Sequence, residues 1–154
     1  MRAEAFIGGY AALMAELPEA RSVPVVRTDF TDDAAWEGIK EKIAEPTEDG
    51  FGADVDFVED HALTGLDEAA IVAIYPRRYP HDYRHPVVFV VDHIAMSMPE
   101  HPVLVVNLNA GVDTPPFRAV PQQVQSIQNN LSLANMDYAE FATSAEPDGV
   151  FRGF

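Results

Sequence analysis

Hydrophobic residues follow two different periods along this chain, one typical of strands and one typical of helices. Apolar runs and alternating apolar residues predict strands over residues 22–28, 53–57, 86–91, 103–108 and 117–120. Apolar residues spaced three and four apart predict helices that begin near the capping or proline residues Asp32, Thr64, Pro121 and Asp137.

The order of these elements indicates the fold class. Strands alternate with helices in the first part of the chain, which favours right-handed crossovers and parallel pairing. Two strands then follow each other directly, which favours an antiparallel addition. We therefore predict a single α/β domain over residues 21–154, with a mixed, mainly parallel sheet of four to five strands flanked by helices.

The first 20 residues form a separate pattern. Apolar residues between Ala3 and Leu17 repeat at three and four, and Pro18 ends the run, which predicts an amphipathic helical extension. Glu4 stands where a signal peptide would be positively charged, so we expect a cytoplasmic protein. The helix either closes over the domain's own core or docks a partner or a second copy, and the sequence leaves both open.

Composition excludes several classes of protein. The 154 residues contain no cysteine, so neither disulfides nor thiolate sites exist. No apolar run is long enough to span a membrane. The net charge is −15, which argues against nucleic acid and anionic membranes as partners. No cofactor motif is present, and we expect neither a cofactor nor a metal.

Candidate chemistry lies where two predicted strands end. Asp29 follows the first strand, and Asp92 and His93 follow the strand over 86–91. Ligands of open α/β sheets bind at the carboxyl ends of parallel strands, and these three residues are our candidate catalytic groups. The helix predicted to begin at Pro121 would bring Gln122 and Gln123 to the same edge of the sheet, where we expect them to bind a ligand. An Asp after a strand is also a common turn or cap residue, so a structural role stays open.

Basic residues concentrate in residues 75–86, where Arg84 is a candidate anchor for an anion, as is Arg118 further along. A solvated loop that balances the acidic charge is the alternative. Residues 29–68 carry 14 acids against Lys40 and Lys42. Such a field either steers a basic partner or is simply a solvated face.

Four segments together resemble an uncharacterised actinobacterial domain family. They are VVRTDFTDDAAWEGI (25–39), PTEDGFGADVDFVED (46–60), YRHPVVFVVD (83–92) and NNLSLANMDYAEFATSAEPDGVFRGF (129–154). The resemblance covers roughly residues 23–154 and leaves the N-terminal helix as an addition. It implies small acidic proteins, and no catalytic residue is carried over from it.

Two hypotheses about function follow. The first is a non-catalytic protein that binds a protein partner or a small ligand, or forms a homodimer through residues 3–17 or the tail at 150–154. The second is a cofactor-independent isomerase, cyclase or hydrolase with Asp92 or His93 as base and Asp29 as its orienting partner. In an enzyme, Asp92→Asn would abolish turnover at nearly unchanged stability, whereas a large stability loss would indicate a structural role.

Overall fold

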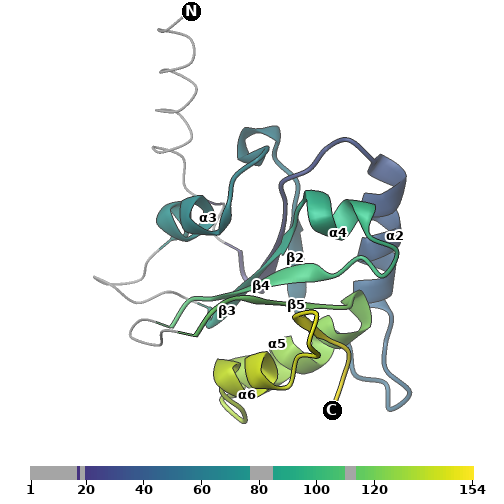
Figure 1. Cartoon of the computed structure of the whole chain (residues 1–154), viewed down its shortest axis with the longest axis vertical. Helices are drawn as coiled ribbons and strands as arrows, with labels where there is room; N and C mark the ends of the chain where they lie inside the picture. Colours follow the sequence, from purple (N-terminus) through teal and green to yellow (C-terminus); the bar gives the residue numbers. More distant parts are fainter. Residues whose placement is uncertain (1–16, 18–19, 77–84, 110–113) are drawn as a thin grey trace, which may run out of the picture.

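The structure is a computed structural model that describes residues 17, 20–76, 85–109 and 114–154. Figure 1 shows its elements in sequence colours. The predicted helix over residues 3–17 lies outside the described residues, apart from Leu17. The candidate anchor Arg84 also lies outside them.

The strands and helices predicted within residues 21–154 are present, with additions. The strands are β1 (Val23–Arg27), β2 (Val55–Val58), β3 (Val87–Val91), β4 (Val103–Asn107), β5 (Phe117–Ala119) and β6 (Val150–Phe151). The helices are α2 (Asp33–Ala44), α3 (Glu68–Ile74), α4 (His93–Ser97), α5 (Val124–Ser132) and α6 (Tyr138–Thr143), with short 3₁₀ turns η1 (His61–Leu63) and η2 (Pro121–Gln123). None of the described helices is long and apolar enough to cross a membrane.

The strands form one sheet in the order β2-β1-β3-β4-β5-β6. β1 pairs in parallel with both β2 and β3, β4 is antiparallel to its neighbours β3 and β5, and β6 is parallel to β5. The predicted fold class is therefore confirmed. The sheet has six strands rather than four or five, because the C-terminal tail adds β6 at one edge.

Helices cover both faces of the sheet (Figure 1). On one face, Trp36, Ile39 and Ile43 of α2 pack with residues of α5 and α6 against the odd-numbered residues of β1 and β3. On the other face, Ile71 and Ile74 of α3 pack against the even-numbered ones. β1 and β3 are buried along their whole length, as expected for strands covered on both faces.

Three helix starts differ from the prediction. Thr64 does not cap α3: its hydroxyl bonds the His61 carbonyl, and Asp67 accepts the Ala70 N–H at the true start. α4 was not predicted, because five residues are too short to display a helical period. Pro121 opens a 3₁₀ turn, after which α5 continues.

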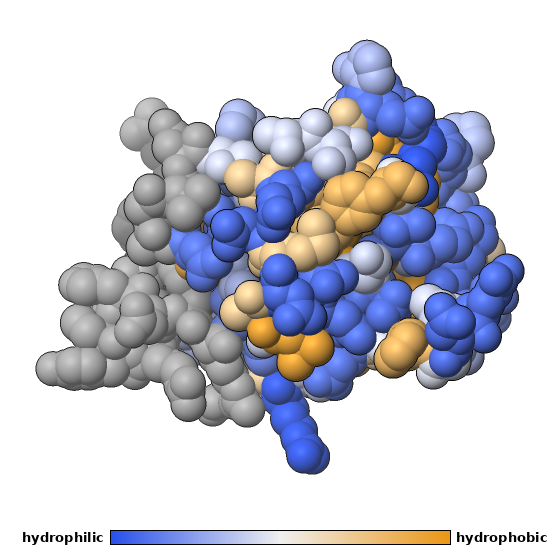
Figure 2. Space-filling view, turned by 90° about the horizontal axis from the view of Figure 1, so that it is seen from below, coloured by the Kyte–Doolittle hydropathy of each residue, from blue (hydrophilic) through white to orange (hydrophobic). Residues whose placement is uncertain are grey.

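Both ends of the described chain contribute to the cores. Leu17 is buried among α3 residues and donates its N–H to the Ile74 carbonyl. At the other end Phe151 is fully buried, whereas Phe154 is 77% exposed, although its ring lies 5.4 Å from that of Phe141. The side seen in Figure 2, where α5, α6 and the C-terminus lie, shows a hydrophobic patch between hydrophilic side chains. The tail is thus docked, but its last ring stays accessible.

Candidate functional site

The carboxyl ends of β1 and β3 meet at one edge of the sheet. The two strands are parallel neighbours with Arg27 opposite Val91, and the pairing extends one residue further through the Thr28 N–H and the Val91 carbonyl. Asp29 therefore leaves β1 beside the point where Asp92 leaves β3. The expected convergence of these two strand ends is present in the fold.

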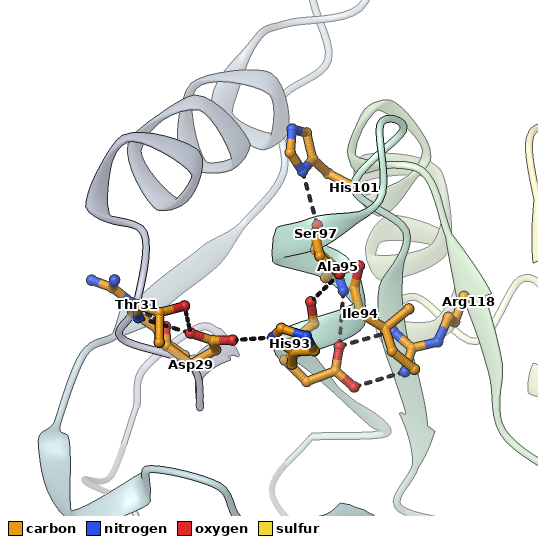
Figure 3. Close-up of polar contacts among 10 residues, drawn as sticks. Asp29, Thr31, His93, Ile94, Ala95, Ser97, His101 and Arg118 are labelled. Atoms are coloured by element: carbon orange, nitrogen blue, oxygen red, sulfur yellow. Dashed lines mark hydrogen bonds and ion pairs between the residues drawn. The ribbon is translucent and has the colours of Figure 1, made fainter.

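Asp29 and His93 are in direct contact across this edge. Nδ1 of His93 lies 2.9 Å from Oδ2 of Asp29, and Figure 3 shows the ring and the carboxylate pointing toward each other. Asp29 is 8% exposed, while the His93 side chain is 78% exposed. One ring nitrogen is therefore held by a buried carboxylate, and the imidazole itself is open to solvent.

The Asp29 carboxylate is held in its ionised form. Burial alone would raise its pKa, but the Thr31 hydroxyl and N–H and the His93 ring all bond it. These bonds outweigh desolvation, so the pKa of Asp29 lies below its usual value. An ionised Asp29 favours the proton on Nδ1 of His93, which leaves Nε2 as the acceptor of the neutral ring.

Asp92 serves a different purpose from Asp29. Its Oδ1 accepts the Ala95 N–H as the cap of α4, and both of its oxygens are bonded by the guanidinium of Arg118, at 2.9 and 2.7 Å. Desolvation opposes ionisation of Asp92, but the bonds from Arg118 and Ala95 prevail and lower its pKa. Arg118 also donates to the Pro102 carbonyl. These contacts connect β5 to the start of α4 and to Pro102, the residue before β4.

A hollow of about 480 Å³ opens beside the Asp29–His93 pair. Besides the pair, its walls come from the strand exits, the turn before α3 and the start of α4, and include Thr28, Phe30, Thr64, Leu66, Asp92 and Ile94. Its volume lies within the range of small-molecule sites. The third acid in its wall, Asp67, caps α3.

The buried side chain of Arg27 holds the chain at this edge through several hydrogen bonds, and it was not identified as a candidate from the sequence. Its side chain is 2% exposed. Nε donates to the Asp29 carbonyl at 2.7 Å, while the terminal nitrogens bond Asp33 and Glu59. The guanidinium also lies over the ring of Phe30. The position of Arg27 in an otherwise apolar strand could have identified it from the sequence. Side chains alternate between the two faces of a strand, which places Arg27 on the face that α2 covers.

The remaining predicted residues lie elsewhere. Gln122 lines a second hollow of about 280 Å³, next to Lys42, Glu100 and Arg152. Gln123 lies near Gly153 in the tail. η2 does begin at the carboxyl edge of the sheet, as expected, because β5 runs in the same direction as β3. It contributes no residue to the hollow beside His93.

Within the described part of the chain, no group of three or more His, Asp or Glu side chains is arranged to hold a metal ion. The Asp29–His93 pair supplies an oriented imidazole at this edge. It can accept a hydrogen bond or a proton from a molecule in the hollow.

Fold and site together define a mixed α/β domain with a histidine–carboxylate pair at the carboxyl edge of its sheet. The chain belongs to the family described as Domain of unknown function (DUF6924), which matches residues 22–154. No curated protein and no solved structure matches the chain.

Proposed function

We propose that this protein binds a small molecule in the hollow at the carboxyl edge of its sheet, with His93 as the group that bonds it. The observation that carries this proposal is the asymmetry of the pair. A buried carboxylate fixes one nitrogen of a ring that is itself 78% exposed, next to a hollow of ligand size. Holding an exposed ring in one orientation lowers the entropy cost of binding a ligand to it.

The charges around the hollow indicate the class of ligand. Asp29, Asp67 and Asp92 all line it. The nearby cation, Arg118, is already bonded by both oxygens of Asp92, so it has little capacity left to anchor an anion. The ligand is therefore uncharged or cationic, with a hydroxyl or amine to donate to Nε2 and an apolar part to contact Phe30, Leu66 and Ile94.

A second candidate function is acid–base catalysis by the same pair. Asp29 orients His93 as the third group of a catalytic triad orients its base. His93 would then take a proton from the bound molecule, as in an isomerase, cyclase or hydrolase that needs no cofactor. Asp92, bonded to Arg118, would position α4 instead of acting as the base.

The binding proposal is tested by ligand-observed NMR with a library of sugars, nucleosides and polyamines. We expect at least one of these compounds to bind, and His93→Gln to weaken its binding about tenfold or more, because one oriented hydrogen bond is lost. His101→Gln is the matched control, since the His101 ring bonds the Ala95 carbonyl at the other end of α4. Equal binding by both variants, or no binding by any compound, would contradict the proposal.

Binding to a protein partner is compatible with this site. We propose residues 3–17 and the tail at 150–154 as contact surfaces for a partner or a second copy, and the exposed ring of Phe154 supports the tail. We also propose, as expected from the sequence, that the protein is cytoplasmic and that its family is actinobacterial.

A further inference from the structure

The two edges of the sheet are protected to different degrees. β6 has only two residues, and both are buried. β2 has four residues, of which only Val58 is buried, and it pairs with β1 alone. Among the described residues, no backbone group of another segment bonds Val55–Val58 from the outer side. An edge strand with unpaired N–H and C=O groups is a template for one more strand.

A hollow of about 660 Å³ follows this edge. Six consecutive residues, Asp56–His61, line it together with Ala20. Because these six lining residues are consecutive, the hollow follows β2 and the chain that leaves it. Five of them precede η1, which begins at His61, and five extended residues span about 17 Å, so a peptide of five to six residues matches this wall.

Carboxylates line the same hollow. Asp56, Glu59 and Asp60 contribute directly, and Ser22 bonds both Asp54 and Asp56, which holds two acids beside the strand. Arg27, on the adjoining strand β1, is buried and bonded to Glu59 and Asp33. A segment that carries lysine or arginine complements this charge.

The same charges disfavour a second copy of this chain at the edge. Pairing one β2 with another would place acids of one copy against acids of the other, and like charges on neighbouring strands are destabilising. The edge therefore discriminates between self-association and a basic partner.

From the unpaired strand, the hollow and its charge, we propose that the outer edge of β2 binds an extended, basic segment of another protein as an added strand. Backbone hydrogen bonds to β2 hold the segment, and its lysine or arginine side chains contact Asp56, Glu59 and Asp60. This mode of recognition is β-strand addition, in which the main chain supplies affinity and the side chains supply specificity. It does not depend on the small-molecule site beside His93.

The test uses the full chain and a capped hexapeptide in which lysine or arginine alternates with valine. We expect NMR shift changes centred on residues 55–61 and slower hydrogen exchange at the outward-facing amides of β2. Methylating alternate backbone nitrogens of the peptide removes its ability to pair while keeping its charge. This methylated peptide should bind at least about tenfold more weakly, since several backbone hydrogen bonds are lost. A peptide with glutamate in place of the basic residues should not bind.

Two triple variants separate this edge from the general acidity of the protein. Asp56→Asn with Glu59→Gln and Asp60→Asn should weaken binding about tenfold at low salt, as three partly exposed charge contacts are lost. The control, Glu41→Gln with Glu45→Gln and Glu48→Gln, changes the net charge equally at exposed residues outside the hollow, and should change binding less than about twofold. Equal weakening by both triple variants, undiminished binding of the methylated peptide, or no binding of the parent peptide would each overturn the proposal.

Discussion

Arg118 and Asp92 form a two-point ion pair that joins β5 to the start of α4. Nη1 and Nη2 of Arg118 lie 2.9 and 2.7 Å from the two oxygens of Asp92, across 26 residues of sequence. Both side chains are partly buried. Asp92, which directly follows β3, therefore connects two elements of the fold, while the side chain of the next residue, His93, is exposed to solvent.

The first prediction concerns this pair. Asp92→Asn keeps a cap for α4 but removes the charge that pairs with Arg118. We expect the free energy of unfolding to fall by about 1.5 to 3 kcal/mol, the range of hydrogen bonds to charged groups. Urea denaturation measures this change.

Asp32→Asn is the matched control, because Asp32 caps α2 through the Ala35 N–H and Asn caps helices as well as Asp does. It should change stability by less than about 0.5 kcal/mol. If Asp92→Asn were as mild as Asp32→Asn, the structural role of Asp92 would be refuted.

The second prediction concerns acid stability. The pKa values of Asp29 and Asp92 are lowered in the folded state, so the folded state binds fewer protons there than the unfolded chain. The stability that these carboxylates contribute is fully present above their unfolded pKa of about 4 and is lost as pH falls through their folded pKa. Unfolding free energies at pH 7, 5 and 3 should therefore decline more steeply below pH 4 in the wild type than in Asp29→Asn. Identical slopes would show that the Asp29 bonds contribute nothing in this window.

The third prediction concerns Arg27, whose buried side chain bonds the Asp29 carbonyl, Asp33 and Glu59. The Arg27 guanidinium also lies over the Trp36 ring, 5.5 Å from its centroid. Arg27→Met keeps a long side chain there but loses the hydrogen bonds. We expect a loss of about 2 to 4 kcal/mol in denaturation experiments, since a buried carbonyl loses its charged donor.

The same variant should change the NMR shifts of the His93 ring, because the turn that carries Asp29 loses an anchor. Lys40→Met is the control, since Lys40 also lies near the Trp36 ring but its ion pair with Glu37 is at the surface. It should cost less than about 1 kcal/mol. An equal cost for both variants would mean that the stacking on Trp36, rather than the buried bonds, dominates.

The fourth prediction concerns the C-terminal tail. Phe151 is fully buried in β6, with its ring 5.3 Å from that of Phe141, so Phe151→Ala should cost about 3 to 5 kcal/mol. Phe154→Ala should cost less than about 1 kcal/mol, because the exposed ring loses little buried area. Thermal denaturation of both variants measures the difference, and a large loss from Phe154→Ala would mean that the last ring belongs to the core.

The spacing of apolar residues, together with capping residues and prolines at helix ends, predicted most of the fold. The apolar runs at residues 22–28 and 86–91 are long enough to be recognised as buried strands, and the residues of α2 and α5 repeat with a helical period. α4 and β6 were missed because five and two residues are too few to show a period. The cap at Asp67 was missed because Thr64, three residues before it, matches a capping box equally well.

The sequence predicted the position of the candidate site and Asp29 as the partner of either Asp92 or His93, and it left the choice between those two open. A local sequence signal placed Asp29, Asp92 and His93 after strands, and parallel pairing of those strands brings them to one edge. Which acid meets the histidine depends on how α4 turns the His93 ring toward β1 and on the arrival of Arg118 from β5. Those contacts join residues 64 and 26 positions apart, and no pattern of neighbouring residues records them.

By itself, the amino-acid sequence determined the fold class, the strand ends that carry acids and the excess of negative charge, because periodicity and composition are properties of the chain alone. Only the tertiary structure decided that Asp29 orients His93, that Arg118 engages Asp92, and that no other described segment pairs with the outer edge of β2. These features depend on which strands become neighbours, and that is settled by the packing of the whole sheet between its two cores.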